Sequence, residues 1–242
     1  MQLECFDIHC HILPGVDDGA KDMAMTEQML RIAASEGINR ILFTPHYREG
    51  MFETDSSVIK SRFEEVRILA EEKFPDLSLF LGSEIYYHSE IINSIKKGRA
   101  WTLANSSYIL AEFSYGRDYP YIRRAAEHLR LEGYRMILAH FERYDCLRDR
   151  LDRLQELVKE GSYLQITADH VVKMHKKIFP NYIKKAFEED LVHLVGTDAH
   201  NDTHRPPMMR ECVACLLKKY GEDVTNRLIF TNPMKILKDE YI

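Results

Sequence analysis

The segment FDIHCHILPGVDDG, residues 6–19, begins as a strand and ends in a loop that is unusually rich in polar side chains. Because side chains alternate between the two faces of a strand, Asp7, His9 and His11 are expected to share one face. Asp17 and Asp18 follow one short turn later. These groups could converge on one point, but a lone His-x-His also suits a half-buried strand facing water. The rest of the chain must decide between the two interpretations.

The same strand, loop and helix pattern recurs along the chain. Short β-rich runs are followed by amphipathic stretches, and the first of these has Asp22 placed to cap its start and Gly37 its end. The predicted strands are residues 5–9, 40–44, 77–82, 107–112, 135–139, 163–167 and 191–197. The predicted helices include residues 22–36, 57–73, 119–132, 147–160 and 207–220. This alternation implies parallel strands joined by crossovers. Without a glycine-rich nucleotide loop or a linker, it predicts one α/β domain, residues 1–242, built as a seven-stranded β/α barrel.

In such barrels the chemistry lies at the carboxyl ends of the strands. Six of the seven predicted strands end in a histidine or an acidic residue, and the sixth strand, ending at Thr167, is the exception. Five of the eleven histidines and four acids gather at this rim: His9, His11, Asp18, His46, Glu84, Glu112, His140, Asp198 and His200. Five other histidines are interpreted as structural or solvent-facing: His88, His128, His175, His193 and His204. The joint pattern predicts a metal site, although each motif alone is weak.

Histidine and carboxylate without thiolate suit Mn²⁺, Fe²⁺ or Zn²⁺. Nine donors exceed what one ion needs, and bridging carboxylates could let them hold two or three ions, an arrangement used for in-line phosphoryl displacement. Four carboxylates around three divalent ions leave a surplus of about two positive charges, which suits a phosphate dianion. Arg143 and Arg205 follow candidate ligands closely in sequence, and a planar guanidinium matches phosphate oxygens bidentately. For either arginine alone, a surface salt bridge is an equally simple reading.

Composition excludes other classes. A net charge of −5 argues against nucleic-acid binding, and the densest basic run, residues 173–185, is interrupted by Pro180 and interpreted as a solvated face. No apolar run is long enough to span a bilayer, and Glu4 interrupts the N-terminus before a signal-peptide core could form. Five cysteines without a framework fit reduced thiols. We therefore expect a cytoplasmic protein without membrane insertion.

These residues resemble a known family. The opening Asp-x-His-x-His, the histidines and glutamates at the strand ends and the closing Asp-x-His resemble the polymerase and histidinol phosphatase (PHP) superfamily. Within it, DIHCHILPGVDDG, TPHYREGMFET, GSEIYY, AEFS, AHFERY, DLVHLVGTDAHN, RPP and NPMKIL are similar to the manganese-dependent protein-tyrosine phosphatases of bacterial capsule and exopolysaccharide loci, the CpsB/CapC/YwqE type. The resemblance runs from residue 3 to the C-terminus and implies a distorted (β/α)7 TIM-like barrel, the PHP fold.

The resemblance also implies roles for single residues. His9, His11, Glu84 and Asp198 would hold one ion, and Glu84 would bridge to a second ion shared with Glu112 and His140. Asp18, His46 and His200 would hold a third. Arg143 and Arg205 match the family's phosphate-binding arginines, and with Asp198 and His200 they are the predicted catalytic residues. The one departure is Phe141, where a proline often stands.

The resemblance therefore implies an Mn²⁺-dependent phosphotyrosine phosphatase whose substrate is a phosphotyrosine-bearing protein, the tyrosine-rich tail of a cognate bacterial tyrosine kinase. A cysteine-based route is excluded, because none of the five cysteines has an arginine six positions later. The alternatives are a histidinol-phosphate or other small phosphomonoester phosphatase, a metal amidohydrolase, and a non-catalytic metal-binding module. An amidohydrolase usually carries a carboxylated lysine where this chain has Glu112, and a non-catalytic module should have lost ligands. The sequence does not determine the oligomeric state, and a homo-oligomer is possible.

Two loops are expected to overhang the ions, residues 46–55 and 113–121, HYREGMFETD and FSYGRDYPY. Their aromatic and thioether side chains could flank a phenyl ring, since aromatic faces stack on one another. Core packing is the alternative for any one of them. The candidates are Tyr47, Met51, Phe52, Phe113, Tyr115, Tyr119 and Tyr121.

Overall fold

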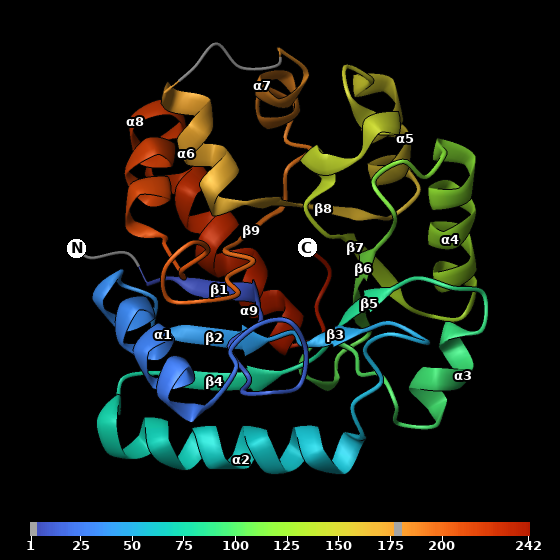
Figure 1. Cartoon of the computed structure of the whole chain (residues 1–242). Coiled ribbons are helices and arrows are strands. Elements are labelled where there is room, and N and C mark those ends of the chain that lie inside the picture. The colour runs from blue at the N-terminus through green and yellow to red at the C-terminus, as the bar shows by residue number, and fades with distance from the viewer. Residues whose placement is uncertain (1–3, 177–180) are drawn as a thin grey trace.

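The computed structural model describes residues 4–176 and 181–242, and strands alternate with helices along both stretches (Figure 1). Residues 177–180, within the basic run expected at the surface, lie outside the described residues. The strands are β1 (Phe6–Cys10), β2 (Arg40–Phe43), β3 (His46–Tyr47), β4 (Ser78–Leu81), β5 (Glu84–Tyr86), β6 (Tyr108–Glu112), β7 (Arg135–Leu138), β8 (Tyr163–Thr167) and β9 (Leu194–Gly196).

The α-helices are α1 (Met23–Ser35), α2 (Ser56–Lys73), α3 (Ile91–Lys96), α4 (Tyr119–Leu131), α5 (Leu151–Lys159), α6 (Ala168–Lys176), α7 (Asn181–Glu188), α8 (Arg210–Asn226) and α9 (Asn232–Leu237). Short 3₁₀ turns cover Leu103–Asn105, Phe141–Arg143 and Asp145–Leu147, and a π-helical turn covers Arg227–Thr231. No helix among the described residues is long and apolar enough to cross a bilayer.

The strands form a curled parallel sheet with helices around it (Figure 1). One part has the order β1-β2-β4 and the other the order β3-β5-β6-β7-β8-β9, with parallel pairing throughout. The chain just beyond β9 returns to β1, where His11 N–H donates to the Ala199 carbonyl and Asp198 N–H to the His9 carbonyl, both at 2.8 Å. The predicted α/β class is confirmed in this TIM-like form, while the count of seven barrel strands stays a prediction.

Two of the predicted strands are each followed by a second short strand that the sequence did not predict. The run 40–44 corresponds to β2, and β3 begins after Thr44 and Pro45; the run 77–82 corresponds to β4, and β5 begins at Glu84. Pro45 has no N–H for a ladder hydrogen bond, which favours the break. The second segments pair with His46 opposite Glu84, the first residue of each. The break therefore places two candidate ligands side by side.

The first helix follows the predicted start and end signals. Asp22 accepts a hydrogen bond from the Met25 N–H at 2.9 Å, as an N-cap residue does. Gly37, just after the helix, has φ +88°, a conformation that glycine adopts without a Cβ clash. Met29 and Leu30 on the inner face are buried against the sheet. Burial of such side chains holds the helix against the sheet. The helix thus packs beside the strands, and their carboxyl ends stay available for polar groups.

Candidate metal centre

All nine side chains predicted as metal ligands lie together at the carboxyl ends of the strands. They come from β1, β3, β5 and β6 and from the loops after β1, β7 and β9. A pocket of about 240 Å³ opens onto them, and it is lined by seven of the nine, Asp18, His46, Glu84, Glu112, His140, Asp198 and His200. His9 and His11 are fully buried. The predicted ligands therefore run from a buried floor to an open mouth.

Glu84 lies at the centre of this cluster. Its Oε2 atom is 3.1 Å from His9 Nε2 and 3.2 Å from both His11 Nε2 and His46 Nδ1. Its Oε1 atom is 3.0 Å from His140 Nε2. One buried carboxylate thus contacts four imidazole rings.

The donor atoms fall into overlapping groups whose members lie within 4.8 Å of one another. The groups are His9, His11, Glu84 and Asp198; His11, Asp18, His46 and His200; and His46, Glu84 and Glu112. His140 joins the last group through contacts of 3.0 Å to Glu84 and 3.6 Å to Glu112. These groups resemble the three expected ligand sets. The difference is that His11 and His46 each lie within reach of two of the proposed ion sites.

Hydrogen bonds at the far side of two rings test whether a cation fits. His9 Nδ1 lies 3.1 Å from Gln165 Oε1, and His11 Nδ1 lies 2.8 Å from Asp17 Oδ2. When each ring is neutral and carries its proton on Nδ1, as it would beside a bound cation, its Nε2 atom is a lone-pair acceptor. These two Nε2 atoms are 3.4 Å apart, and the adjacent Glu84 Oε2 is buried without a hydrogen-bond partner. Converging acceptors of this kind fit a divalent cation held by histidines whose rings Gln165 and Asp17 orient.

Asp17 was named from the sequence without an assigned role, and Gln165 was missed. Asp17 also accepts the N–H groups of His46 and Gly19, both at 2.9 Å. Gln165 Oε1 accepts the His140 N–H at 2.9 Å, while its Nε2 donates to the Ile166 carbonyl. The only sequence signal for Gln165 is an amide in the middle of an otherwise apolar strand.

The cluster also alters the pKa values of its members. Burial alone would raise the pKa of Glu84, but the charge of His9 lowers it well below its usual value. Burial raises the pKa of Glu112 to about 8, and the charge of Glu84 adds to the rise. Burial lowers the pKa of His200 to about 3, with the charge of His11 acting in the same direction. A bound cation would relieve these conflicts, because it favours ionised carboxylates and neutral imidazoles together.

Two candidate ligands have unusual backbone conformations. His140 has φ +34° and Asp198 has φ +53°, in the left-handed region that costs energy for residues with a Cβ. After His140, the Glu142 carboxylate accepts the Thr167 N–H and hydroxyl at 3.1 and 2.7 Å. These hydrogen bonds connect the turn Phe141–Arg143, which directly follows His140, to the end of β8.

The two predicted phosphate-binding arginines both contact Asp198. Arg143 Nη2 is 2.7 Å from Asp198 Oδ2, and Arg205 Nη2 donates to the same oxygen and to the Asp198 carbonyl. Both arginines line the pocket and are partly exposed. Asp198 Oδ1 faces His9 and His11 at 3.5 Å. Asp198 therefore lies between the arginines and the imidazole cluster.

Asp7 does not join the histidines, contrary to the expectation from strand alternation. Its carboxylate accepts the Thr197 N–H at 2.9 Å and the Thr197 hydroxyl at 2.5 Å, fully buried between β1 and the end of β9. The register of β1 shifts between Asp7 and Cys10, so alternation does not continue regularly to His9. Asp7 joins two strands instead of facing the pocket.

The loop side chains divide into two sets. Met51, Phe52 and Tyr115 line the pocket, and the Phe52 ring stacks on His46 with centroids 5.2 Å apart. The other four do not line it: Tyr47, Phe113 and Tyr119 are buried, and Tyr121 packs edge-on against Phe113. For these four residues the alternative of core or loop packing describes the structure, since three are buried and Tyr121 is half-buried against Phe113.

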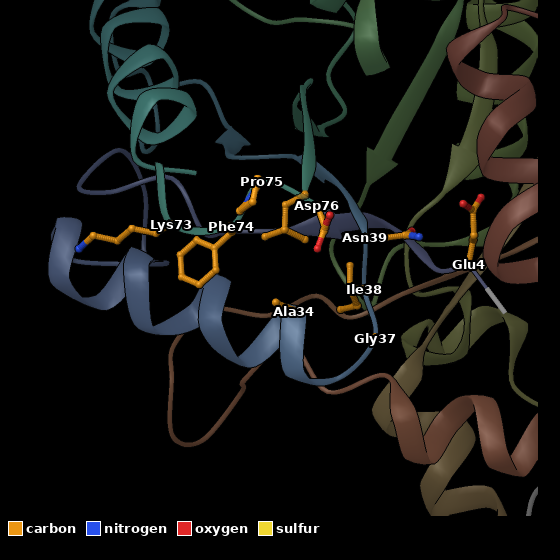
Figure 2. Close-up of a pocket in the computed structure, with 10 residues that line it drawn as sticks. Glu4, Ala34, Gly37, Ile38, Asn39, Lys73, Phe74, Pro75 and Asp76 are labelled. Atoms are coloured by element: carbon orange, nitrogen blue, oxygen red, sulfur yellow. The ribbon is translucent and has the colours of Figure 1, made fainter. Parts of the chain in front are cut away.

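A larger cavity lies at the opposite ends of the strands and has a different character. Its volume is about 480 Å³, and Figure 2 shows its lining, in which the polar residues are Glu4, Asn39, Lys73 and Asp76. Lys73 is paired with Glu27 at 2.7 Å, and Glu4 with Arg40 at 3.1 Å. No convergent set of histidines or carboxylates faces this cavity among its lining residues.

The fold and the donor cluster define an α/β protein with a candidate histidine and carboxylate metal centre at the carboxyl ends of its strands. The chain belongs to the capsular polysaccharide synthesis CpsB/CapC family, whose model matches residues 5–238. The resemblance drawn from the sequence is thereby confirmed.

The relatives are named as tyrosine phosphatases. The chain is 37% identical over 243 residues to tyrosine-protein phosphatase CpsB of Streptococcus pneumoniae, covering 98% of this chain and 99% of the relative. It is 32% identical over 219 residues to tyrosine-protein phosphatase YwqE of Bacillus subtilis, covering 90% and 86%. A solved structure from a study of YwqE and CpsB, described as unique metal-dependent tyrosine phosphatases, superposes with a TM-score of 0.89 at 30% identity and covers 98% of this chain and 96% of that one.

Proposed function

We propose that this chain is a metal-dependent protein-tyrosine phosphatase that hydrolyses phosphotyrosine in a protein substrate. The observation that carries the proposal is the buried acceptor cluster around Glu84 with two arginines on its Asp198 side. The full-length similarity to named tyrosine-protein phosphatases supports it. The proposed physiological substrate is the tail of a cognate bacterial tyrosine kinase that regulates capsule or exopolysaccharide synthesis.

The proposed ion ligands are those expected from the sequence. His9, His11, Glu84 and Asp198 would hold one ion, Glu84, Glu112 and His140 a second, and Asp18, His46 and His200 a third. The proposed metal is Mn²⁺, because imidazole and carboxylate without thiolate suit it. When bound, divalent ions would supply Lewis acidity that polarises phosphoryl oxygens and favours ionisation of the attacking water.

The side chains of the pocket would then bind and orient the substrate. Arg143 and Arg205 each have N–H donors beyond those that contact Asp198, and their planar groups match phosphate oxygens. They would bind the phosphoryl group through hydrogen bonds and stabilise the negative charge that spreads over its oxygens in the transition state. Asp198 holds both arginines, and its carbonyl bonds to the His200 ring, which places these four predicted catalytic residues in one contact set.

The leaving group needs little help. A tyrosine phenol has a pKa of about 10, so phenolate is a tolerable leaving group without a dedicated general acid. Phe52, Met51 and Tyr115 surround the pocket mouth and would contact the phenyl ring. We further propose that the chain acts in the cytoplasm as one catalytic domain.

The test is activity on a phosphotyrosine peptide beside histidinol phosphate, with Mn²⁺ added and then chelated. The proposal predicts hydrolysis of the peptide that depends on Mn²⁺. Hydrolysis of histidinol phosphate in preference to the peptide would favour a small-molecule phosphatase. Full activity after prolonged chelation would contradict the metal assignment.

A further inference from the structure

A third arginine lines the pocket, and its surroundings differ from those of the other two. Arg143 and Arg205 contact Asp198, whereas Arg48 forms no ion pair with any residue that the structure describes. Its guanidinium carbon lies 4.2 Å above the ring of Tyr86. Stacking on an aromatic face leaves the edge of the guanidinium, with its N–H donors, available to an anion.

The strand register sets the height of Arg48 above the cluster. His46 pairs with Glu84 and Tyr47 with Ile85, so Arg48 continues this line two residues beyond the level of the candidate ligands. Two strand residues correspond to about 6.6 Å. A tyrosine ring whose phosphate lies at the level of Glu84 would end near this height, where the peptide backbone begins. Arg48 is therefore placed to meet a residue that flanks the phosphotyrosine.

Local contacts hold Arg48 at this position. Its N–H donates to the Phe52 carbonyl at 3.0 Å, and the Phe52 N–H donates back at 2.8 Å. Two acids of the same loop have other partners: Glu49 lies 3.5 Å from His88, and Glu53 accepts the Gly50 N–H at 3.0 Å. Neither acid lines the pocket.

We propose that Arg48 is a specificity-determining residue that binds a carboxylate adjacent to the phosphotyrosine of an acidic peptide substrate. This inference rests on the proposed phosphatase activity and names the substrate class more closely. The charge and height of Arg48 fit an acidic flanking residue, while the other two arginines lie at Asp198, where they would face the phosphoryl group. Because the pair is accessible to solvent, its contribution is modest and falls with added salt.

The experiment compares two phosphotyrosine peptides of equal length with Mn²⁺ present. One carries Glu on both sides of the phosphotyrosine and the other carries Gln, and the measured quantity is the ratio of their kcat/KM values. Wild-type protein should favour the Glu peptide, and Arg48→Gln should reduce the ratio about threefold to fivefold, the size of one exposed ion pair. Arg48→Glu should reverse the preference.

Arg117→Gln is the matched control. Arg117 also stacks on a tyrosine, with its guanidinium carbon 4.4 Å from the ring of Tyr121, but it does not line the pocket. This variant should keep the wild-type ratio. p-Nitrophenyl phosphate, which has no flanking residues, provides the second comparison.

Three results would overturn the inference. If wild-type protein hydrolyses both peptides equally, no acidic residue is recognised, although the proposed function stands. If Arg48→Gln lowers activity on both peptides and on p-nitrophenyl phosphate in equal proportion, Arg48 shapes the pocket and does not bind a substrate carboxylate. If neither peptide is hydrolysed, the proposed function fails and the inference fails with it.

Discussion

Replacing Asp17 with asparagine should weaken metal binding without removing any proposed ligand. The Asp17 carboxylate is fully buried and accepts three hydrogen bonds, from His11 Nδ1–H, His46 N–H and Gly19 N–H. Burial alone would raise the pKa of Asp17, but His11 lowers it to about 2, so the carboxylate is ionised at neutral pH. Asparagine supplies one oxygen and one NH₂ group, so at least one of the three donors would face another donor.

The expected loss follows from these contacts. A hydrogen bond to a charged group contributes about 1.5–3 kcal/mol, and an unsatisfied buried donor adds a penalty of similar size. Part of this loss would appear as lower stability. The rest would appear in metal binding, because loss of a partner that orients a ligand lowers metal affinity about 10-fold to 100-fold.

The assay is titration of metal-free Asp17→Asn protein with Mn²⁺, followed by calorimetry and by phosphotyrosine peptide hydrolysis. Asp22→Asn is the control, because Asp22 also accepts a backbone N–H but caps α1 and contacts no histidine. Asp17→Asn should need at least about tenfold more Mn²⁺ than the wild-type protein for half-maximal activity. Asp22→Asn should need the same Mn²⁺ concentration as the wild-type protein. Wild-type Mn²⁺ affinity in a folded Asp17→Asn protein would refute the reasoning.

Three further predictions concern the candidate ligands, the cysteines and His193. His9→Ala or His200→Ala should abolish hydrolysis and lower metal content by elemental analysis, while circular dichroism shows a folded chain. His128→Ala, which loses a hydrogen bond and a ring contact with Tyr87, should do neither. Equal harm from all three variants would contradict the site. Alkylating agents should leave activity largely intact, whereas EDTA should remove it and Mn²⁺ restore it; loss on alkylation alone would argue for a thiol. Burial lowers the pKa of His193 to about 4, below its value of about 6.5 in the unfolded chain. As the pH falls, the unfolded state therefore binds this proton before the folded state does. The free energy of unfolding should decrease by about 2 kcal/mol between pH 7 and pH 5 because of this residue. Denaturant unfolding of His193→Gln should show a correspondingly flatter pH dependence.

The sequence was sufficient to predict the class of fold and the gathering of the nine candidate ligands. The reason is geometric: parallel strands joined by crossovers bring all their carboxyl ends to one edge, so residues far apart in sequence meet there. His46 and Glu84 were correctly placed in this way even though each begins a separate short strand. The break at Pro45 was itself visible in the sequence, since proline lacks the N–H that a continuous strand needs.

Residues that act through other residues were harder to predict. Asp17 and Asp18 are identical neighbours in sequence, yet Asp17 is buried against His11 while Asp18 is exposed near His46 and His200. Only the path of the loop separates their roles. Asp7 was placed wrongly because a register shift in β1 interrupts regular alternation, and no sequence pattern signals such a shift.

The burial of two loop aromatics follows from the alternation of side chains along a strand. Tyr47 directly follows His46 in β3, and Phe113 directly follows Glu112 at the end of β6. Since successive strand residues point to opposite faces, an inward-facing ligand implies an outward-facing neighbour. Tyr47 and Phe113 accordingly pack against helices and loops, and Tyr47 donates to the Ser94 hydroxyl.

The most direct measurement compares phosphotyrosine peptide, phosphoserine peptide and histidinol phosphate under identical Mn²⁺ conditions. The account predicts a kcat/KM for the phosphotyrosine peptide at least about tenfold above the other two, which corresponds to about 1.4 kcal/mol in transition-state binding. The physical source of this preference would be Phe52, Met51 and Tyr115 around the phenyl ring. A preference for histidinol phosphate would contradict the proposed substrate while leaving the metal assignments in place, and equal turnover of all three would remove the case for a tyrosine phosphatase.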